Sequence, residues 1–151
     1  IKIIKNLTLF LLLLGIIFST LSNIDNLSQL NPNSPIKDSL QYMANNTPSY
    51  NLIFSHPQDS YLVEYYAGRP AFIHYHDSDY QNRKKIVDQA LNSTYIEDTF
   101  PLFKFNDISH IYISPKTRVD LPTERGLLFL LQNERFKKIY TRHNIEIWEF
   151  Q

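Results

Sequence analysis

Cysteine is absent from the 151-residue sequence, which excludes disulfide scaffolds, thiol catalysis and cysteine-ligated zinc sites. Glycine is scarce, with three residues in the chain, so a phosphate-cradling loop of the P-loop or GxGxxG kind cannot be built. A basic excess is also lacking, because 15 basic residues balance 15 acidic ones, and we expect no nucleic-acid partner. Nothing in the composition indicates a cofactor. Hydrophobic residues make up 43% of the chain, which is enough for one packed domain.

A long apolar run lies near the N-terminus, at residues 7–21 (LTLFLLLLGIIFSTL). With the residues before it, the run approaches the roughly 20 residues that cross a bilayer, so we predict a transmembrane helix and a lipid contact at residues 1–22. A secretory signal peptide is the alternative, since Lys2 and Lys5 precede the run, although no clear A-x-A cleavage site follows it. Both interpretations leave the lysines in the cytoplasm and make residues 23–151 extracytoplasmic.

The rest of the sequence alternates helical and strand patterns after a polar linker at residues 23–33. Ser34 and Pro35 are typical of a helix start, and His143-Asn144 is typical of a tight hairpin turn. The expected helices are 34–46, 57–67, 79–91, 95–105 and 124–133, and the expected strands are 51–55, 70–75, 108–114, 136–142 and 145–150. Strands that alternate with helices favour helices on both faces of a sheet. We therefore predict an α/β fold at residues 34–151, a three-layer sandwich with a mostly parallel sheet and a C-terminal antiparallel hairpin.

Polar side chains follow the expected strands at their carboxyl ends, which is where ligands bind in open parallel sheets. The ligand-binding candidates are His56, Arg69, His76, Asp77, Lys116 and Arg118. Lys116 and Arg118, helped by Arg69, fit an anion or a sugar phosphate. The alternative is that Lys116 and Arg118 belong to a solvated polar loop and that Asp77 caps a helix.

Two catalytic hypotheses use the same part of the sequence. His56, His76 and Asp79 have the residue types of a zinc site, but their spacing departs from the HxHxDH pattern of metallo-β-lactamases, and we predict no metal. Ser55 or Ser60 with His56 would suit a hydrolase, but the GxSxG nucleophile turn is absent. We therefore assign no catalytic residue.

Two further groups of side chains have structural and functional interpretations. Tyr61, Tyr65 and Tyr66 could stack on a sugar ring, and packing into the core is the simpler expectation. The run Arg83-Lys84-Lys85 is expected to form an exposed helix face.

Several short motifs recur in one known family of membrane enzymes. They are Asn46-Thr47-Pro48, Leu52-Ile53-Phe54-Ser55, Glu64-Tyr65-Tyr66-Ala67-Gly68-Arg69-Pro70, Ser109-His110-Ile111-Tyr112-Ile113-Ser114 and the two final strands. The stretch from Ser34 to Gln151 resembles the soluble C-terminal domain of multispan glycosyltransferases of the GT-C type. These enzymes use lipid-linked sugar donors, and they include oligosaccharyltransferase catalytic subunits and dolichyl-phosphate-mannose mannosyltransferases.

The resemblance implies a soluble extracytoplasmic domain that is non-catalytic by itself and takes part in protein glycosylation. In that family the catalytic acidic residues lie in loops between early membrane helices, and nothing in this sequence corresponds to them. The Trp-Trp-Asp-type motif is also absent, since the only tryptophan is Trp148. The upstream catalytic part of the same polypeptide is the expected partner, and a first residue Ile1 in place of methionine fits a C-terminal piece. A stand-alone membrane-anchored binding module is the alternative, and an independent hydrolase or metal enzyme is the third hypothesis.

Overall fold

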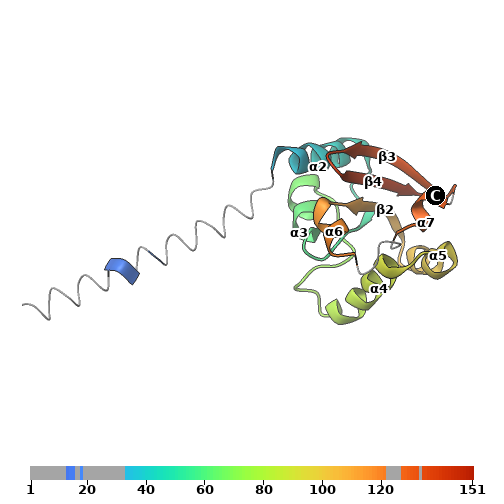
Figure 1. Cartoon of the computed structure of the whole chain (residues 1–151), viewed down its shortest axis with the longest axis horizontal. Coiled ribbons are helices and arrows are strands. Elements are labelled where there is room, and N and C mark those ends of the chain that lie inside the picture. The colour runs from blue at the N-terminus through green and yellow to red at the C-terminus, as the bar shows by residue number, and fades with distance from the viewer. Residues whose placement is uncertain (1–12, 16–17, 19–32, 122–126, 133) are drawn as a thin grey trace, which may run out of the picture. The chain divides into compact units, whose positions relative to one another are not determined.

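The computed structural model describes residues 13–15, 18, 33–121, 127–132 and 134–151 (Figure 1). Almost all of the predicted transmembrane helix and linker lies outside these residues. Within the described part, no helix is both long and apolar enough to cross a membrane. The chain divides into two units, residues 1–33 and 34–151, and every described strand belongs to the second.

Four strands form one mixed sheet in the order β1-β2-β4-β3. They are β1 (Leu52–Phe54), β2 (Ile108–Ile113), β3 (Phe136–Arg142) and β4 (Ile145–Phe150). β1 pairs with β2 in parallel, whereas β4 pairs antiparallel with both β2 and β3. The prediction of a mostly parallel sheet is therefore wrong.

The expected strand at residues 70–75 is the reason for this error. It contributes one isolated bridge, between Ala71 and Ile53. The chain then turns, because the His74 backbone N–H donates to the Asp77 carboxylate at 3.1 Å. Phe72 is buried, so the apolar run reflects burial in a loop and not strand pairing.

The C-terminal hairpin forms as predicted. β3 and β4 are joined by His143 and Asn144, whose φ angles of 50° and 62° are both positive. Two consecutive residues with positive φ make the type I′ turn, whose twist matches that of the two strands it joins.

The helices match most of the expected ranges. They are α2 (Ser34–Asn46), α3 (Ser60–Leu62), the π-helix η1 (Val63–Ala67), α4 (Tyr80–Asn92), α5 (Ile96–Phe105), α6 (Pro115–Val119) and α7 (Phe129–Gln132). The expected helix 124–133 begins in a segment, residues 122–126, that lies outside the described residues. The interpretation of Lys116 and Arg118 as part of a polar loop is wrong, because Ser114 caps α6 and Pro115 occupies its first position.

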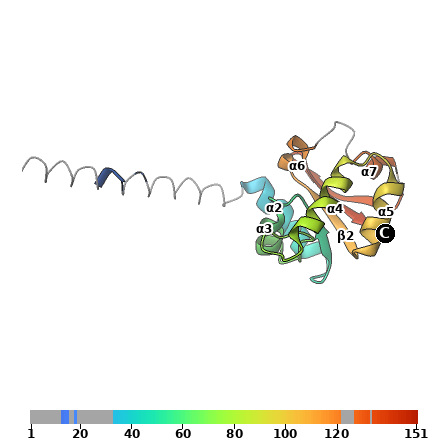
Figure 2. The ribbon, with the colours of Figure 1, turned by 90° about the horizontal axis from the view of Figure 1, so that it is seen from below.

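Helices cover both faces of the sheet, over two separate cores (Figures 1 and 2). Side chains alternate along β2, so Ile111 and Ile113 enter the larger core while Tyr112 enters the smaller one. α4 and α5 pack on the larger core, and Phe103 of α5 is fully buried there. α2 packs on the smaller core through Leu40 and Met43.

Candidate functional site

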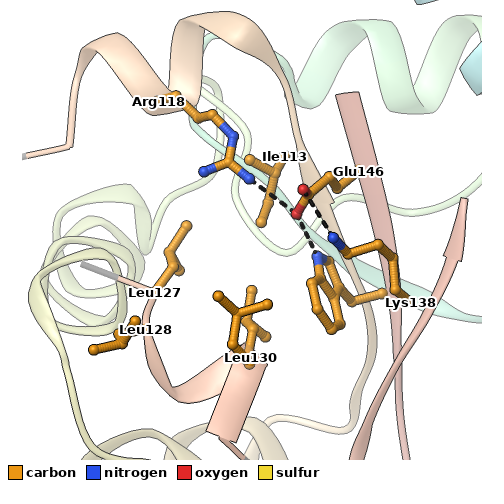
Figure 3. Close-up of a pocket in the computed structure, with 9 residues that line it drawn as sticks. Ile113, Arg118, Leu127, Leu128, Leu130, Lys138 and Glu146 are labelled. Carbon is orange, nitrogen blue, oxygen red and sulfur yellow. Dashed lines mark hydrogen bonds and ion pairs between the residues drawn. The ribbon is translucent and has the colours of Figure 1, made fainter. Parts of the chain in front are cut away.

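A pocket of about 220 Å³ lies beside the larger core, where α6 and the segment leading into α7 meet the sheet. Its apolar lining consists of Ile113, Leu127, Leu128, Leu130, Leu131 and Trp148, and its polar lining of Arg118, Lys138 and Glu146. Figure 3 shows Arg118 and Lys138 reaching Glu146 from two sides, with Leu127, Leu128 and Leu130 across the pocket. A small pocket thus combines an aliphatic wall with a charged wall.

Strand alternation explains how the polar wall forms. Glu146 and Trp148 are two residues apart on β4, so they lie on the same face of the sheet. Lys138 is the β3 partner of Trp148 in the strand register. Arg118 comes from α6, which directly follows β2. Three segments that are far apart in sequence therefore place their charges at one point.

Glu146 is the centre of the polar wall. Its carboxylate accepts hydrogen bonds from Lys138 Nζ at 3.0 Å and from the Trp148 indole N–H at 2.9 Å, and it pairs with Arg118 Nη2 at 2.9 Å. Its side chain is 15% exposed. Burial alone would raise the pKa of Glu146, but the two hydrogen bonds and the two cations outweigh burial and hold this pKa below its ordinary value. Glu146 is therefore ionised near neutral pH.

The position of α6 depends on a buried carboxyl group, Asp59. Ser114 Oγ donates to Asp59 Oδ2 at 2.6 Å, and Thr117 Oγ1 donates to the same oxygen at 3.3 Å. Asp59 is 3% exposed, and burial raises its pKa, although the Ser114 hydrogen bond and the nearby His56 partly oppose this shift. Asp59 therefore connects the start of α3 to the cap of α6, the helix that carries Arg118.

The structure brings few of the sequence-predicted residues to this pocket. Arg118 lines it, whereas Lys116, from the same helix, does not. His56 lies two residues beyond the end of β1, and its Nε2 lies 3.7 Å from Asp120 Oδ2. The ligand-binding role proposed for these residues stays a prediction.

The guanidinium group of Arg69 is held by hydrogen bonds within the domain. Its Nε donates to Thr47 Oγ1, its Nη1 donates to the carbonyls of Ala67 and Gly68, and its Nη2 donates to those of Ala44 and Thr47. These five bonds occupy all five guanidinium N–H groups. Arg69 thereby joins the end of α2 to the end of η1 and does not line the pocket.

His76 and Asp77 lie in the loop before α4. Asp77 accepts a hydrogen bond from the His74 backbone and pairs with Arg83 at 3.3 Å, so it organises the turn. In the part of the chain that the structure describes, no three His, Asp or Glu side chains are placed to hold a metal ion.

Neither serine of the hydrolase hypothesis, Ser55 or Ser60, donates its hydroxyl hydrogen bond to His56. The Ser55 hydroxyl is fully buried and has no hydrogen-bond partner among the described residues. Ser60 Oγ donates to the Pro57 carbonyl at 2.7 Å.

The tyrosines of the second helical segment divide between surface and core. Tyr61 and Tyr66 pack against the smaller core, whereas Tyr65 is 79% exposed and meets Tyr66 edge-on at 4.9 Å. In the basic run after the His76 loop, Lys84 pairs with Asp88 and Lys85 is exposed, whereas Arg83 donates to the Phe72 carbonyl at 2.7 Å, so the predicted exposed face is only partly correct.

Sequence reasoning missed Lys138 and Glu146 as site residues and assigned Trp148 only to packing. One signal was available. The period of two along residues 145–150 places Glu146 on the face that carries Trp148 and Phe150. A carboxylate on an otherwise apolar strand face needs partners, and its partners define the pocket wall.

Known proteins match this chain in structure. No family model matches the sequence, and no curated protein matches it. One solved structure of the C-terminal globular domain of oligosaccharyltransferase from Archaeoglobus fulgidus is similar with a TM-score of 0.61 at 10% identity, over 80% of this chain and 99% of that domain. A second C-terminal globular domain of oligosaccharyltransferase from the same organism gives a TM-score of 0.51 at 12% identity, over 80% of this chain and 97% of that one. At such identities the likeness shows the fold, and this fold is the one that the sequence motifs imply.

Proposed function

We propose that residues 34–151 are the extracytoplasmic C-terminal domain of a membrane glycosyltransferase of the GT-C type, which uses a lipid-linked sugar donor. The observation that carries the proposal is the shared fold, which extends over almost the whole oligosaccharyltransferase domain. The motif resemblance, from Asn46-Thr47-Pro48 to the last strand, supports it independently. The domain is non-catalytic by itself, because the sequence lacks the acidic loops and the Trp-Trp-Asp-type motif of that family.

The proposal includes a membrane location and a partner. Residues 1–22 contact the lipid bilayer as the last transmembrane helix, and residues 23–33 link that helix to the domain. The partner is the upstream catalytic part of the same polypeptide, which supplies the acidic residues that this chain lacks.

The absence of cysteine gives a direct test of location. Tyr50 is 81% exposed and Ile53 is fully buried, so Tyr50→Cys and Ile53→Cys form a matched pair. In intact cells, a membrane-impermeant maleimide should label Tyr50→Cys and leave Ile53→Cys unlabelled until the protein is denatured. Labelling of Tyr50→Cys only after cell lysis would contradict an extracytoplasmic domain.

The length of the native reading frame upstream of Ile1, checked by the mass of the mature protein, tests the partner. A product with several membrane spans and acidic residues in its first outer loop is the expected result, and membranes that hold it should transfer sugar from a lipid-linked donor. The 151-residue chain alone should not.

A stand-alone membrane-anchored binding module is the second candidate function. The pocket at Glu146 favours it, because a cavity with a few converging polar groups is a common form of ligand site. A reading frame that opens within a few residues of Ile1 would support this function and end the first.

A further inference from the structure

We propose that the pocket between α6 and β4 binds a small carboxylate ligand with a short apolar body, held by Arg118 and Lys138. This site is independent of the proposed transferase role. Three features of the pocket carry the inference: its charge, its lining and its size.

The charge of the polar wall is unbalanced. Among the described residues that line the pocket, Arg118 and Lys138 supply two positive charges, and Glu146 supplies the only negative one. The remaining charge of one positive unit matches one carboxylate, whereas a phosphate monoester carries nearly two negative charges at neutral pH. Both cations also stay accessible, since the side chain of Arg118 is 43% exposed and that of Lys138 is 32% exposed. Either can donate to a ligand without releasing Glu146, because each cation has more N–H groups than its bond to Glu146 uses.

The aliphatic lining of the pocket favours a ligand whose carboxylate is attached to an apolar group. Ile113, Leu127 and Leu130 are at most 5% exposed, so they present a closed aliphatic wall. Lys138 Nζ lies 4.7 Å from the centroid of the Trp148 ring, and Trp148 as a whole is 5% exposed. Little indole surface is therefore open for a sugar ring to stack on, whereas an alkyl group gains by displacing water from the leucine wall. The chemistry therefore favours an apolar body over a polyhydroxyl one.

The volume limits the size of the ligand. About 220 Å³ is below the usual range of roughly 300–1,000 Å³ for drug-sized ligands. A branched aliphatic acid of the size of a leucine side chain fits this limit, with its carboxylate at the wall that holds Arg118.

Glu146 acts here as a positioning residue. Its ion pairs fix a helix cation, Arg118, and a strand cation, Lys138, at the same edge of the pocket. Without a carboxylate between them, the two cations would repel each other and separate into solvent. The cost of burying Glu146 on an apolar sheet face is offset by its own hydrogen bonds and ion pairs, and the same contacts hold two donors where a ligand can reach them.

Trp148 provides the readout, because it is the only tryptophan and its indole N–H donates to Glu146. The single indole N–H signal in a ¹H–¹⁵N NMR spectrum of the full chain would be followed while 4-methylpentanoate is added. A saturable shift is the expected result. The neutral 4-methylpentanamide should bind at least about tenfold more weakly, since it lacks the charge-assisted hydrogen bonds. Acetate and inorganic phosphate should also bind more weakly, because they lack the apolar body.

Two variants locate the site. Arg118→Gln should weaken 4-methylpentanoate binding by about tenfold or more, and Lys138→Gln provides a second measurement if the first variant fails to fold. Arg142→Gln, a change at an exposed arginine of β3 outside the pocket, should leave binding unchanged. Equal binding of acid and amide, equal binding of 4-methylpentanoate and acetate, or undiminished binding by the pocket variants would each overturn the proposal. None of these results depends on sugar transfer or topology, so the two proposals can fail separately.

Discussion

Replacing Arg69 with methionine removes the guanidinium group and keeps most of the aliphatic stem. In the native structure this group donates five hydrogen bonds, four of them to acceptors that are partly buried. The acceptors include carbonyls near the ends of α2 and η1, where the helix dipole is negative. The variant therefore leaves two helix ends without their shared donor, and we expect a less stable domain.

The magnitude follows from the number and burial of these bonds. Losing one hydrogen bond from a charged donor costs about 1.5–3 kcal/mol, and water can replace part of the set at a half-exposed site. One to two effective bonds give an expected decrease in the free energy of unfolding of about 2–4 kcal/mol. Arg69→Lys keeps the charge but not the planar fork, so it should recover less than half of the loss.

Urea unfolding of the purified chain, followed by Trp148 fluorescence, measures this free energy. Arg142→Met is the matched control, because Arg142 is exposed on β3, and its effect should stay within about 0.5 kcal/mol. A decrease of less than about 1 kcal/mol for Arg69→Met, or one equal to that of the control, would refute the assignment of Arg69 as the link between the two helix ends.

Three further predictions concern other parts of the domain. The raised pKa of Asp59 means that its carboxyl group binds a proton more tightly in the folded state, so the contribution of Asp59 to stability should fall as pH rises from the ordinary value of 3.8 through the folded-state pKa and stay level above it. The lowered pKa of Glu146 acts in the opposite direction, so the free energy of unfolding of the wild type minus that of Asp59→Asn, from urea unfolding at several pH values, is the quantity that should show this fall. The double change His143→Asn with Asn144→Gly suits the type I′ turn better and should raise the free energy of unfolding, measured with urea, by about 0.5–1 kcal/mol. An unchanged or lower free energy of unfolding would contradict the type I′ assignment. Phe103→Ala should cost about 3–5 kcal/mol, because its buried ring contacts four other phenylalanines, whereas Phe105→Ala, at an 88% exposed position, should change the thermal midpoint little.

Local signals in the sequence predicted most of the elements. Ser34-Pro35 at the start of α2 and His143-Asn144 in the hairpin are decided by nearby backbone chemistry, so both were predictable. The cap of α6 was also local, but the charged residues after Ser114 favoured the interpretation as a solvated loop. The prediction of a strand at residues 70–75 is wrong because a short apolar segment indicates burial without specifying strand pairing.

By itself, the sequence determined the α/β class, the hairpin and the exclusion of cysteine and glycine-rich chemistry, because these depend on composition and on short-range periodicity. The tertiary structure decided the strand order, the antiparallel neighbours of β4 and the pocket. Arg118, Lys138 and Glu146 come from α6, β3 and β4, and no spacing along the chain relates them. Arg69 looked like a ligand-binding cation, and only the folded positions of the ends of α2 and η1 show what its donors bind. Contacts between distant segments arise from packing, which local propensity does not encode.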